Sequence, residues 1–135
     1  MRTIEHIHGF LDSFVSWTSD QPDVQATALV GSYARGAAKD DSDIDLVVLT
    51  DQPQKYLDDL KWMERFGVIK KHQTEDYGKL TSLRVWYQNG YEVEYGITTP
   101  DWAATPLDAG TREVILGGMI VLFERGILLS RLAKL

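Results

Sequence analysis

Residues 31–49 read GSYARGAAKDDSDIDLVVL and join a glycine-serine pair to an acidic segment and then to an apolar run. The acidic segment holds Asp40, Asp41, Asp43 and Asp45, and the residues LVVL follow it directly. Carboxylates this close repel one another, and each resists ionisation beside the others. A strand that enters the core from such a cluster therefore needs a cation or a polar partner nearby.

The alternation of side chains along a strand predicts that Asp43 and Asp45 project together while Ile44 points into the core. Paired carboxylates are oxygen ligands of the kind that a hard divalent cation such as Mg²⁺ prefers. Upstream, Gly31 permits a close approach of the backbone to a ligand. Ser32 offers a hydroxyl at the start of a predicted short helix, where free N–H groups attract phosphate. Phosphoryl or nucleotidyl transfer requires this combination of a phosphate cradle and metal-binding carboxylates.

The composition of the 135 residues, 44% hydrophobic and 25% charged, is that of an ordinary globular protein. The length predicts one domain over residues 1–135. The net charge of −6 argues against general electrostatic binding to nucleic acid. The N-terminus lacks the apolar segment of a secretory signal, and the longest apolar run, residues 115–123, is far shorter than the ~20 residues of a membrane span. Because the sequence also has no cysteine, we expect a cytoplasmic protein without disulfides or membrane contact.

Hydrophobic periodicity and turn signals predict an α+β fold with a mixed, largely antiparallel sheet and helices packed on one side of it. The clearest local signal is a hairpin, in which residues 80–87 and 91–98 are joined at Asn89-Gly90. Further strands are expected at residues 26–31, 44–49, 68–72 and 119–123. Helices are expected at residues 4–15, 32–39, 56–66 and 127–135, with one more short helix that Thr111 caps.

The order of residues excludes other motifs that the acidic segment matches in part. An EF-hand loop that begins at Asp41 would have Leu46 in place of its glycine and Gln52 in place of its bidentate glutamate. In haloacid-dehalogenase-type phosphatases the aspartates follow an apolar strand, whereas DIDLV at 43–47 precedes one. Neither a Walker A nor a GxGxxG motif is present. Without the glycine-serine pair, a solvated polar turn would be the preferred interpretation.

The pair GS followed by SDID after a short helix resembles the signature of the DNA polymerase β-type nucleotidyltransferase superfamily. TEDYGKLTSLRVWY, NGYEVEYGITTPDWA and PLDAGTREVILGG are similar to segments of small stand-alone bacterial proteins of this superfamily. The resemblance implies that Gly31 and Ser32 bind phosphate and that Asp43 and Asp45 bind metal. It also implies a third carboxylate on a later strand, where this chain has glutamate and many relatives have aspartate.

Glu92 and Glu94 both lie on that later strand and on the same face, so periodicity alone cannot separate them. Glu92 is next to the hairpin turn, where a charge stays hydrated at little cost. Glu94 lies ~7 Å further along the strand, where a carboxylate needs compensation. We therefore predict Asp43, Asp45 and Glu94 as catalytic and metal-binding residues, and the Val93-Glu94-Tyr95 context agrees with the family pattern.

Two arginines complete the predicted nucleotide site. Arg35 follows the glycine-serine turn, and a solvated helix face is an equally good interpretation of it. Arg84 lies on the hairpin, and its face relative to the glutamates depends on whether the turn has two or three residues. With Gly31 and Ser32, these arginines are the residues we expect to contact the nucleotide.

The predicted function is metal-dependent transfer of a nucleoside monophosphate from an NTP, with ATP as first choice, to a hydroxyl acceptor. Mg²⁺ or Mn²⁺ is the expected cofactor, and the acceptor is a small molecule or a protein. The resemblance suggests a HEPN-type ribonuclease toxin as partner, with this chain as its antitoxin, and a homodimer is a further candidate assembly. The alternative is a nucleotide-binding regulatory or antitoxin-type module that keeps the site but transfers nothing.

Overall fold

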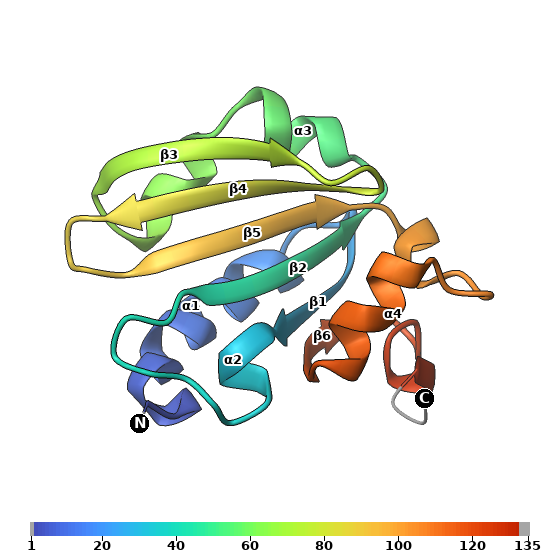
Figure 1. Cartoon of the computed structure of the whole chain (residues 1–135). Coiled ribbons are helices and arrows are strands. Elements are labelled where there is room, and N and C mark those ends of the chain that lie inside the picture. The colour runs from blue at the N-terminus through green and yellow to red at the C-terminus, as the bar shows by residue number, and fades with distance from the viewer. Residues whose placement is uncertain (1, 133–135) are drawn as a thin grey trace.

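The computed structural model of the protein describes residues 2–132 and contains a sheet with the strand order β3-β4-β5-β2-β1-β6 (Figure 1). The strands are β1 (Val24–Val30), β2 (Ile44–Thr50), β3 (Ile69–Asp76), β4 (Leu80–Tyr87), β5 (Glu92–Thr98) and β6 (Met119–Glu124). Neighbouring strands pair antiparallel except β2 and β5, which are parallel. The prediction of an α+β fold with a largely antiparallel sheet is confirmed.

Helices precede, connect and follow the strands. They are η1 (Ile4–Ile7), α1 (His8–Ser19), α2 (Gly31–Ala34), α3 (Pro53–Asp58), η2 (Lys61–Phe66), η3 (Pro100–Ala103), α4 (Ala109–Leu116) and η4 (Ser130–Leu132), where η marks a 3₁₀ helix. Within residues 2–132 no helix combines the length and the apolar character needed to cross a membrane.

Helices cover both faces of the sheet, so the prediction that they pack on one side is wrong. On one face Leu46 and Val48 of β2 pack in a cluster with Phe14 of α1 and Met63 of η2. On the other face Val47 of β2 packs with residues of η3, α4 and the C-terminal segment, namely Trp102, Ala103, Ile115, Leu129 and Leu132. The reason is visible in β1 and β2, whose last five residues are all buried, so that side chains on both faces of these strands need cover.

Two predicted helices differ from the expectation, one in length and one in continuity. The helix predicted at residues 32–39 ends at Ala34, and the chain then takes a left-handed conformation at Gly36, with φ of 73°. The helix predicted at residues 56–66 is divided into α3 and η2, because Asp59 between them is extended, with φ of −130° and ψ of 111°. Hydrophobic spacing persists across this break, which is why the sequence suggested one helix.

The C-terminal part also differs from the prediction. Helix α4 is capped by Asp108, whose side chain accepts a hydrogen bond from the Gly110 N–H, whereas Thr111 lies inside the helix. The closing helix predicted at residues 127–135 is reduced to the 3₁₀ turn η4, and residues 133–135 of that prediction lie outside the described residues.

The β4–β5 hairpin fixes which side chains share a face with the acidic segment. Trp86 pairs with Glu92, and the Tyr87 N–H donates to the Tyr91 carbonyl, which leaves Gln88, Asn89 and Gly90 as the turn. A three-residue turn puts Arg84 directly opposite Glu94 and settles the question that the sequence left open.

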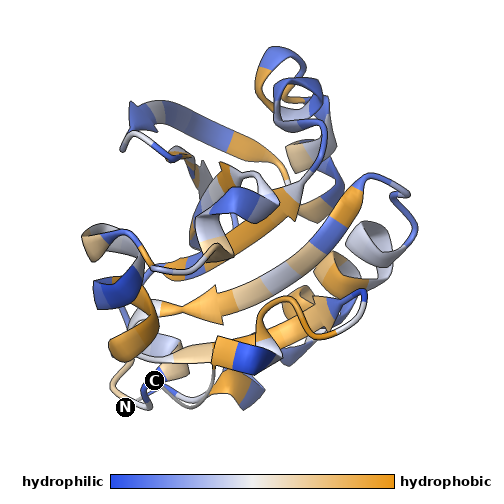
Figure 2. Ribbon diagram, turned by 90° about the vertical axis from the view of Figure 1, so that its right-hand side faces the viewer, coloured by the Kyte–Doolittle hydropathy of each residue, from blue (hydrophilic) through white to orange (hydrophobic). Residues whose placement is uncertain are grey.

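The edge strand β3 differs in character from the interior strands. Figure 2 shows it as mostly hydrophilic, while β1 and β2 are hydrophobic along most of their length. Its residues are largely exposed, and it extends to Asp76, beyond the residues 68–72 that the sequence predicted. Charged residues on an exposed edge strand discourage pairing with other chains. Because these residues are polar, β3 lacks the alternation of apolar residues from which its full length could be predicted.

Candidate active site

Asp43, Asp45 and Glu94 meet at the start of the parallel pair β2 and β5. The pairing places Asp45 opposite Glu94, and Asp43 lies two residues earlier on the same face. One carboxylate oxygen from each of the three lies within 4.8 Å of the others. Ile44 between the aspartates is buried in the core, as the alternation predicts. The structure thus brings together the three acidic side chains selected from the sequence.

Gly31 lies immediately beside this carboxylate group. It has φ of 74°, a conformation that L side chains rarely adopt. A Cβ added there would overlap Asp45 Oδ2 and would lie 3.0 Å from Asp45 Cγ. Glycine is therefore required at position 31 for two reasons, the turn into α2 and the space that the Asp45 carboxylate occupies.

Crowding perturbs the ionisation of Asp45. Burial raises the pKa of this carboxyl, and the charges and hydrogen bonds of Asp43 and then Glu94 raise it further, from 3.8 to about 8. Near neutral pH this raised pKa favours the protonated carboxyl of Asp45 unless a cation compensates the negative charge. A divalent ion supplies that compensation.

Glu94 is held in place from β4. The Ser82 hydroxyl donates to Glu94 Oε1 at 2.7 Å, and Arg84 Nη2 donates to Glu94 Oε2 at 3.1 Å. Glu92 is not part of the three-carboxylate group; its Oε2 accepts from Arg84 Nη1 at 2.5 Å instead. The two glutamates that periodicity could not separate therefore have different surroundings.

The predicted nucleotide-binding residues lie in different positions around the carboxylates. Ser32 is half-buried in the first turn of α2, and the exposed Arg35 follows that helix and lines a cavity with Gly31. Arg84 lies among acidic side chains, with its guanidinium also 3.3 Å from Asp43 Oδ2. In this structure Arg84 is paired with protein carboxylates.

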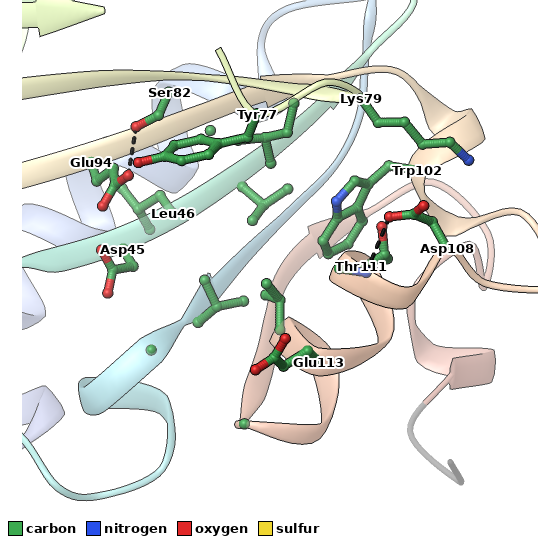
Figure 3. A pocket seen from close by; sticks show the side chains of 18 of the residues that line it. Asp45, Leu46, Tyr77, Lys79, Ser82, Glu94, Trp102, Asp108, Thr111 and Glu113 are labelled. Carbon is green, nitrogen blue, oxygen red and sulfur yellow. Dashed lines mark hydrogen bonds between the residues drawn. The ribbon is translucent and has the colours of Figure 1, made fainter. Parts of the chain in front are cut away.

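A cavity of about 740 Å³ extends from the carboxylates to η3 and α4. Figure 3 shows Asp45 and Glu94 toward one end of it and Trp102 and Thr111 toward the other. This volume is in the range of small-molecule sites. The cavity wall formed by η3 and α4 was not anticipated, because nothing in the sequence indicates that these helices cover this face of the sheet.

Sequence reasoning also missed Ser82 as the support of Glu94. The signal was present in the hairpin, because Ser82 and Arg84 are two residues apart and share a face. Without the turn length, that face could not be assigned.

The donor set suits a hard divalent cation. All three side chains offer carboxylate oxygens, the ligand type that Mg²⁺ and Mn²⁺ favour, and their close approach needs positive charge. Asp43, Asp45 and Glu94 would be the residues that hold such an ion.

Comparison of the sequence with protein families gives a match between residues 13–97 and the model of the nucleotidyltransferase domain. This match covers more than half of the chain and includes the glycine-serine turn and the three carboxylates. The sequence has no significant match among curated proteins.

Solved structures share the fold at low sequence identity. An aminoglycoside 6-adenyltransferase from Bacillus subtilis has a TM-score of 0.57 and 14% identity over 70% of this chain and 35% of that one. The polymerase core of TRAMP, an RNA surveillance complex, has a TM-score of 0.51 and 15% identity over 67% of this chain and 30% of that one. A cytoplasmic RNA terminal U-transferase has a TM-score of 0.50 and 18% identity over 68% and 28%. The chain therefore spans about a third of the length of these structures, and the likeness concerns the fold.

Proposed function

Because the chain belongs to the nucleotidyltransferase domain family, we propose that it moves a nucleoside monophosphate from an NTP to an acceptor hydroxyl. ATP is the proposed donor. The hydroxyl oxygen forms a bond to the α-phosphorus, the bond from that phosphorus to the β-phosphate oxygen breaks, and pyrophosphate leaves. We also propose that residues 1–135 form one nucleotidyltransferase domain.

The observation that carries this proposal is the approach of three carboxylates to within 4.8 Å beside a glycine turn. In the proposed role, Asp43, Asp45 and Glu94 hold Mg²⁺ or Mn²⁺, and Glu94 also accepts the proton of the attacking hydroxyl. When bound, the divalent ions offset negative charge on the phosphates and on the attacking oxygen.

The remaining predicted residues serve the nucleotide. Gly31 and Ser32 cradle the β- and γ-phosphates in this proposal, and Arg35 adds a positive charge at the edge of the cavity. The cavity leaves room beside the carboxylates for an acceptor, either a small molecule or a side chain of a partner protein.

The test is release of pyrophosphate from ATP in the presence of Mg²⁺, with α-³²P-labelled ATP to detect any acceptor that becomes labelled. We expect release by the wild-type protein and its loss in Glu94→Gln. Glu92→Gln is the matched control, because it makes the same chemical change on the same strand outside the three-carboxylate group, and it should be milder. Tight ATP binding without pyrophosphate release or labelling would favour a regulatory module instead.

A further inference from the structure

The guanidinium of Arg84 is surrounded by carboxylates. It lies within ion-pairing distance of Asp43 (3.3 Å), Glu75 (3.2 Å), Glu92 (2.5 Å) and Glu94 (3.1 Å). The Arg84 side chain is only 23% exposed, so these contacts are partly shielded from water. Glu75 lies on β3, Glu92 and Glu94 lie on β5, and Asp43 directly precedes β2. One positive charge cannot neutralise these four carboxylates.

The four contacts divide into two groups. Nη1 and Nη2 donate to Asp43 Oδ2 and Glu94 Oε2, which belong to two of the proposed metal ligands. Nε donates to Glu75 Oε1, and Nη1 also donates to Glu92 Oε2, and neither glutamate belongs to the three-carboxylate group. The Tyr77 hydroxyl donates to the other oxygen of Glu75 at 2.6 Å, which fixes that carboxylate from the β3–β4 turn. Arg84 thus keeps an anchor even if its contacts with the metal ligands are lost.

A carboxylate oxygen that accepts from a guanidinium has less electron density to offer a metal ion, and the guanidinium charge repels a nearby dication. We propose that Arg84 is the counter-ion of the metal-free site and that an arriving divalent ion displaces it from Asp43 and Glu94. The guanidinium stays paired with Glu75 and Glu92. This inference rests on the proposed function for the identity of the ligands, and it assigns Arg84 a role in setting metal affinity.

The proposal is tested by titration of Mn²⁺ at pH 8 without nucleotide, with free Mn²⁺ followed by electron paramagnetic resonance. Arg84→Met keeps the length of the side chain and removes its charge, and we expect it to bind Mn²⁺ about tenfold more tightly than wild type, as removal of one partly shielded positive charge implies. Arg84→Lys keeps the charge and should bind as wild type does. Equal or weaker Mn²⁺ binding by folded Arg84→Met would overturn the proposal.

A measurement on the wild-type protein covers the case in which Arg84→Met does not fold. The side-chain ¹⁵N signals of Arg84 are assigned by their absence in Arg84→Lys, and Mg²⁺ is then added. We expect the Nη signals to shift as contacts with Asp43 and Glu94 are lost, while the Nε signal changes little because its partner Glu75 remains. Nη signals that do not move as Mg²⁺ saturates the site would contradict the exchange.

These readouts do not depend on catalysis. If Mn²⁺ affinity responds to Arg84 as expected but ATP gives no pyrophosphate, the proposed transfer fails and the exchange stands. If pyrophosphate is released but Arg84→Met leaves Mn²⁺ affinity unchanged, the exchange alone fails.

Discussion

Asp23 and Asp45 are carboxylates near opposite ends of strand β2, and they differ in the hydrogen bonds and the neighbouring charges that set their pKa values. Near the Thr50 end, Asp23 accepts hydrogen bonds from Thr50 Oγ1 at 2.6 Å, the Tyr56 hydroxyl at 2.7 Å and Lys55 Nζ at 2.8 Å. At the other end, Asp45 faces Asp43 and Glu94, which carry the same charge. Both groups are shielded from water, but among the described residues only the Asp23 carboxylate accepts side-chain hydrogen bonds from Thr50, Lys55 and Tyr56.

The pKa values express this difference. Burial alone would raise the pKa of Asp23, but the hydrogen bonds from Lys55, Thr50 and Tyr56 outweigh it and lower the value from 3.8 to about 2. The pKa of Asp45 moves the other way, to about 8. The Asp23 cluster therefore stabilises the fold near neutral pH, whereas the Asp45 cluster costs stability until a ligand supplies positive charge. That cost is what we expect of a functional site.

The largest expected effect comes from Asp45→Asn. Loss of a metal ligand should reduce pyrophosphate release about a thousandfold, because divalent ions contribute several kcal/mol of charge stabilisation in such reactions. The same change should raise the melting temperature of the metal-free protein at pH 8, because it removes the crowded charge. Activity and stability would then move in opposite directions. A folded Asp45→Asn protein that keeps full activity would place the site elsewhere.

Gly31→Ala tests whether the position of Asp45 matters. The added Cβ would overlap the Asp45 carboxylate, and the positive φ disfavours alanine in any case. We expect Gly31→Ala to lower activity about a hundredfold, because a displacement of a ligand group by about 1 Å can have an effect of this size. Gly9→Ala is the control, because a Cβ at Gly9 meets no atom within 4 Å. Calorimetry with Mn²⁺ should show weaker binding for Gly31→Ala only.

The pH dependence of stability should separate the two clusters. Because the pKa of Asp45 is raised in the folded protein, the metal-free protein loses stability as pH rises from about 4 to about 8. Saturating Mg²⁺ should remove this loss, and so should Asp45→Asn. Thermal unfolding in EDTA and in Mg²⁺ across this range measures the effect, and parallel curves would show that Asp45 is not the group responsible.

Asp23→Asn should act on stability alone. The lowered pKa of Asp23 corresponds to about 2 kcal/mol of stabilisation, which is present above pH 3.8 and is lost as pH falls through about 2. Urea unfolding at pH 7 should show a loss of this size, and Mn²⁺ affinity should be unchanged. A change in metal affinity would mean that the two ends of β2 are coupled.

Much of this fold follows from local sequence patterns. The buried strand at residues 44–49 and the hairpin around Asn89-Gly90 carry strong signals, because apolar runs and turn chemistry act over a few residues. The packing of η3 and α4 on the second face of the sheet cannot be predicted from local patterns. It depends on which distant segments the apolar faces of β1 and β2 contact. The division between α3 and η2 is likewise invisible to periodicity.

In the candidate site, too, some features follow from local sequence patterns and others depend on contacts between distant segments. Alternation along β2 was enough to pair Asp43 with Asp45, but the neighbourhood of Asp45 and Glu94 depends on the parallel pairing of β2 with β5, which no local pattern reveals. The position of Arg84 among four carboxylates required the three-residue turn. The catalytic roles of these residues stay predictions that experiments must test.

The central claim is that the crowded carboxylates of Asp43, Asp45 and Glu94 form a metal site that serves the nucleotide. Crystals grown with Mn²⁺ and a non-hydrolysable ATP analogue test it directly, because anomalous scattering locates manganese independently of the protein atoms. We predict an anomalous peak that places a manganese ion within bonding distance of all three carboxylates, with the triphosphate beside Gly31. A nucleotide bound without manganese at this position, or manganese bound only elsewhere, would contradict the account.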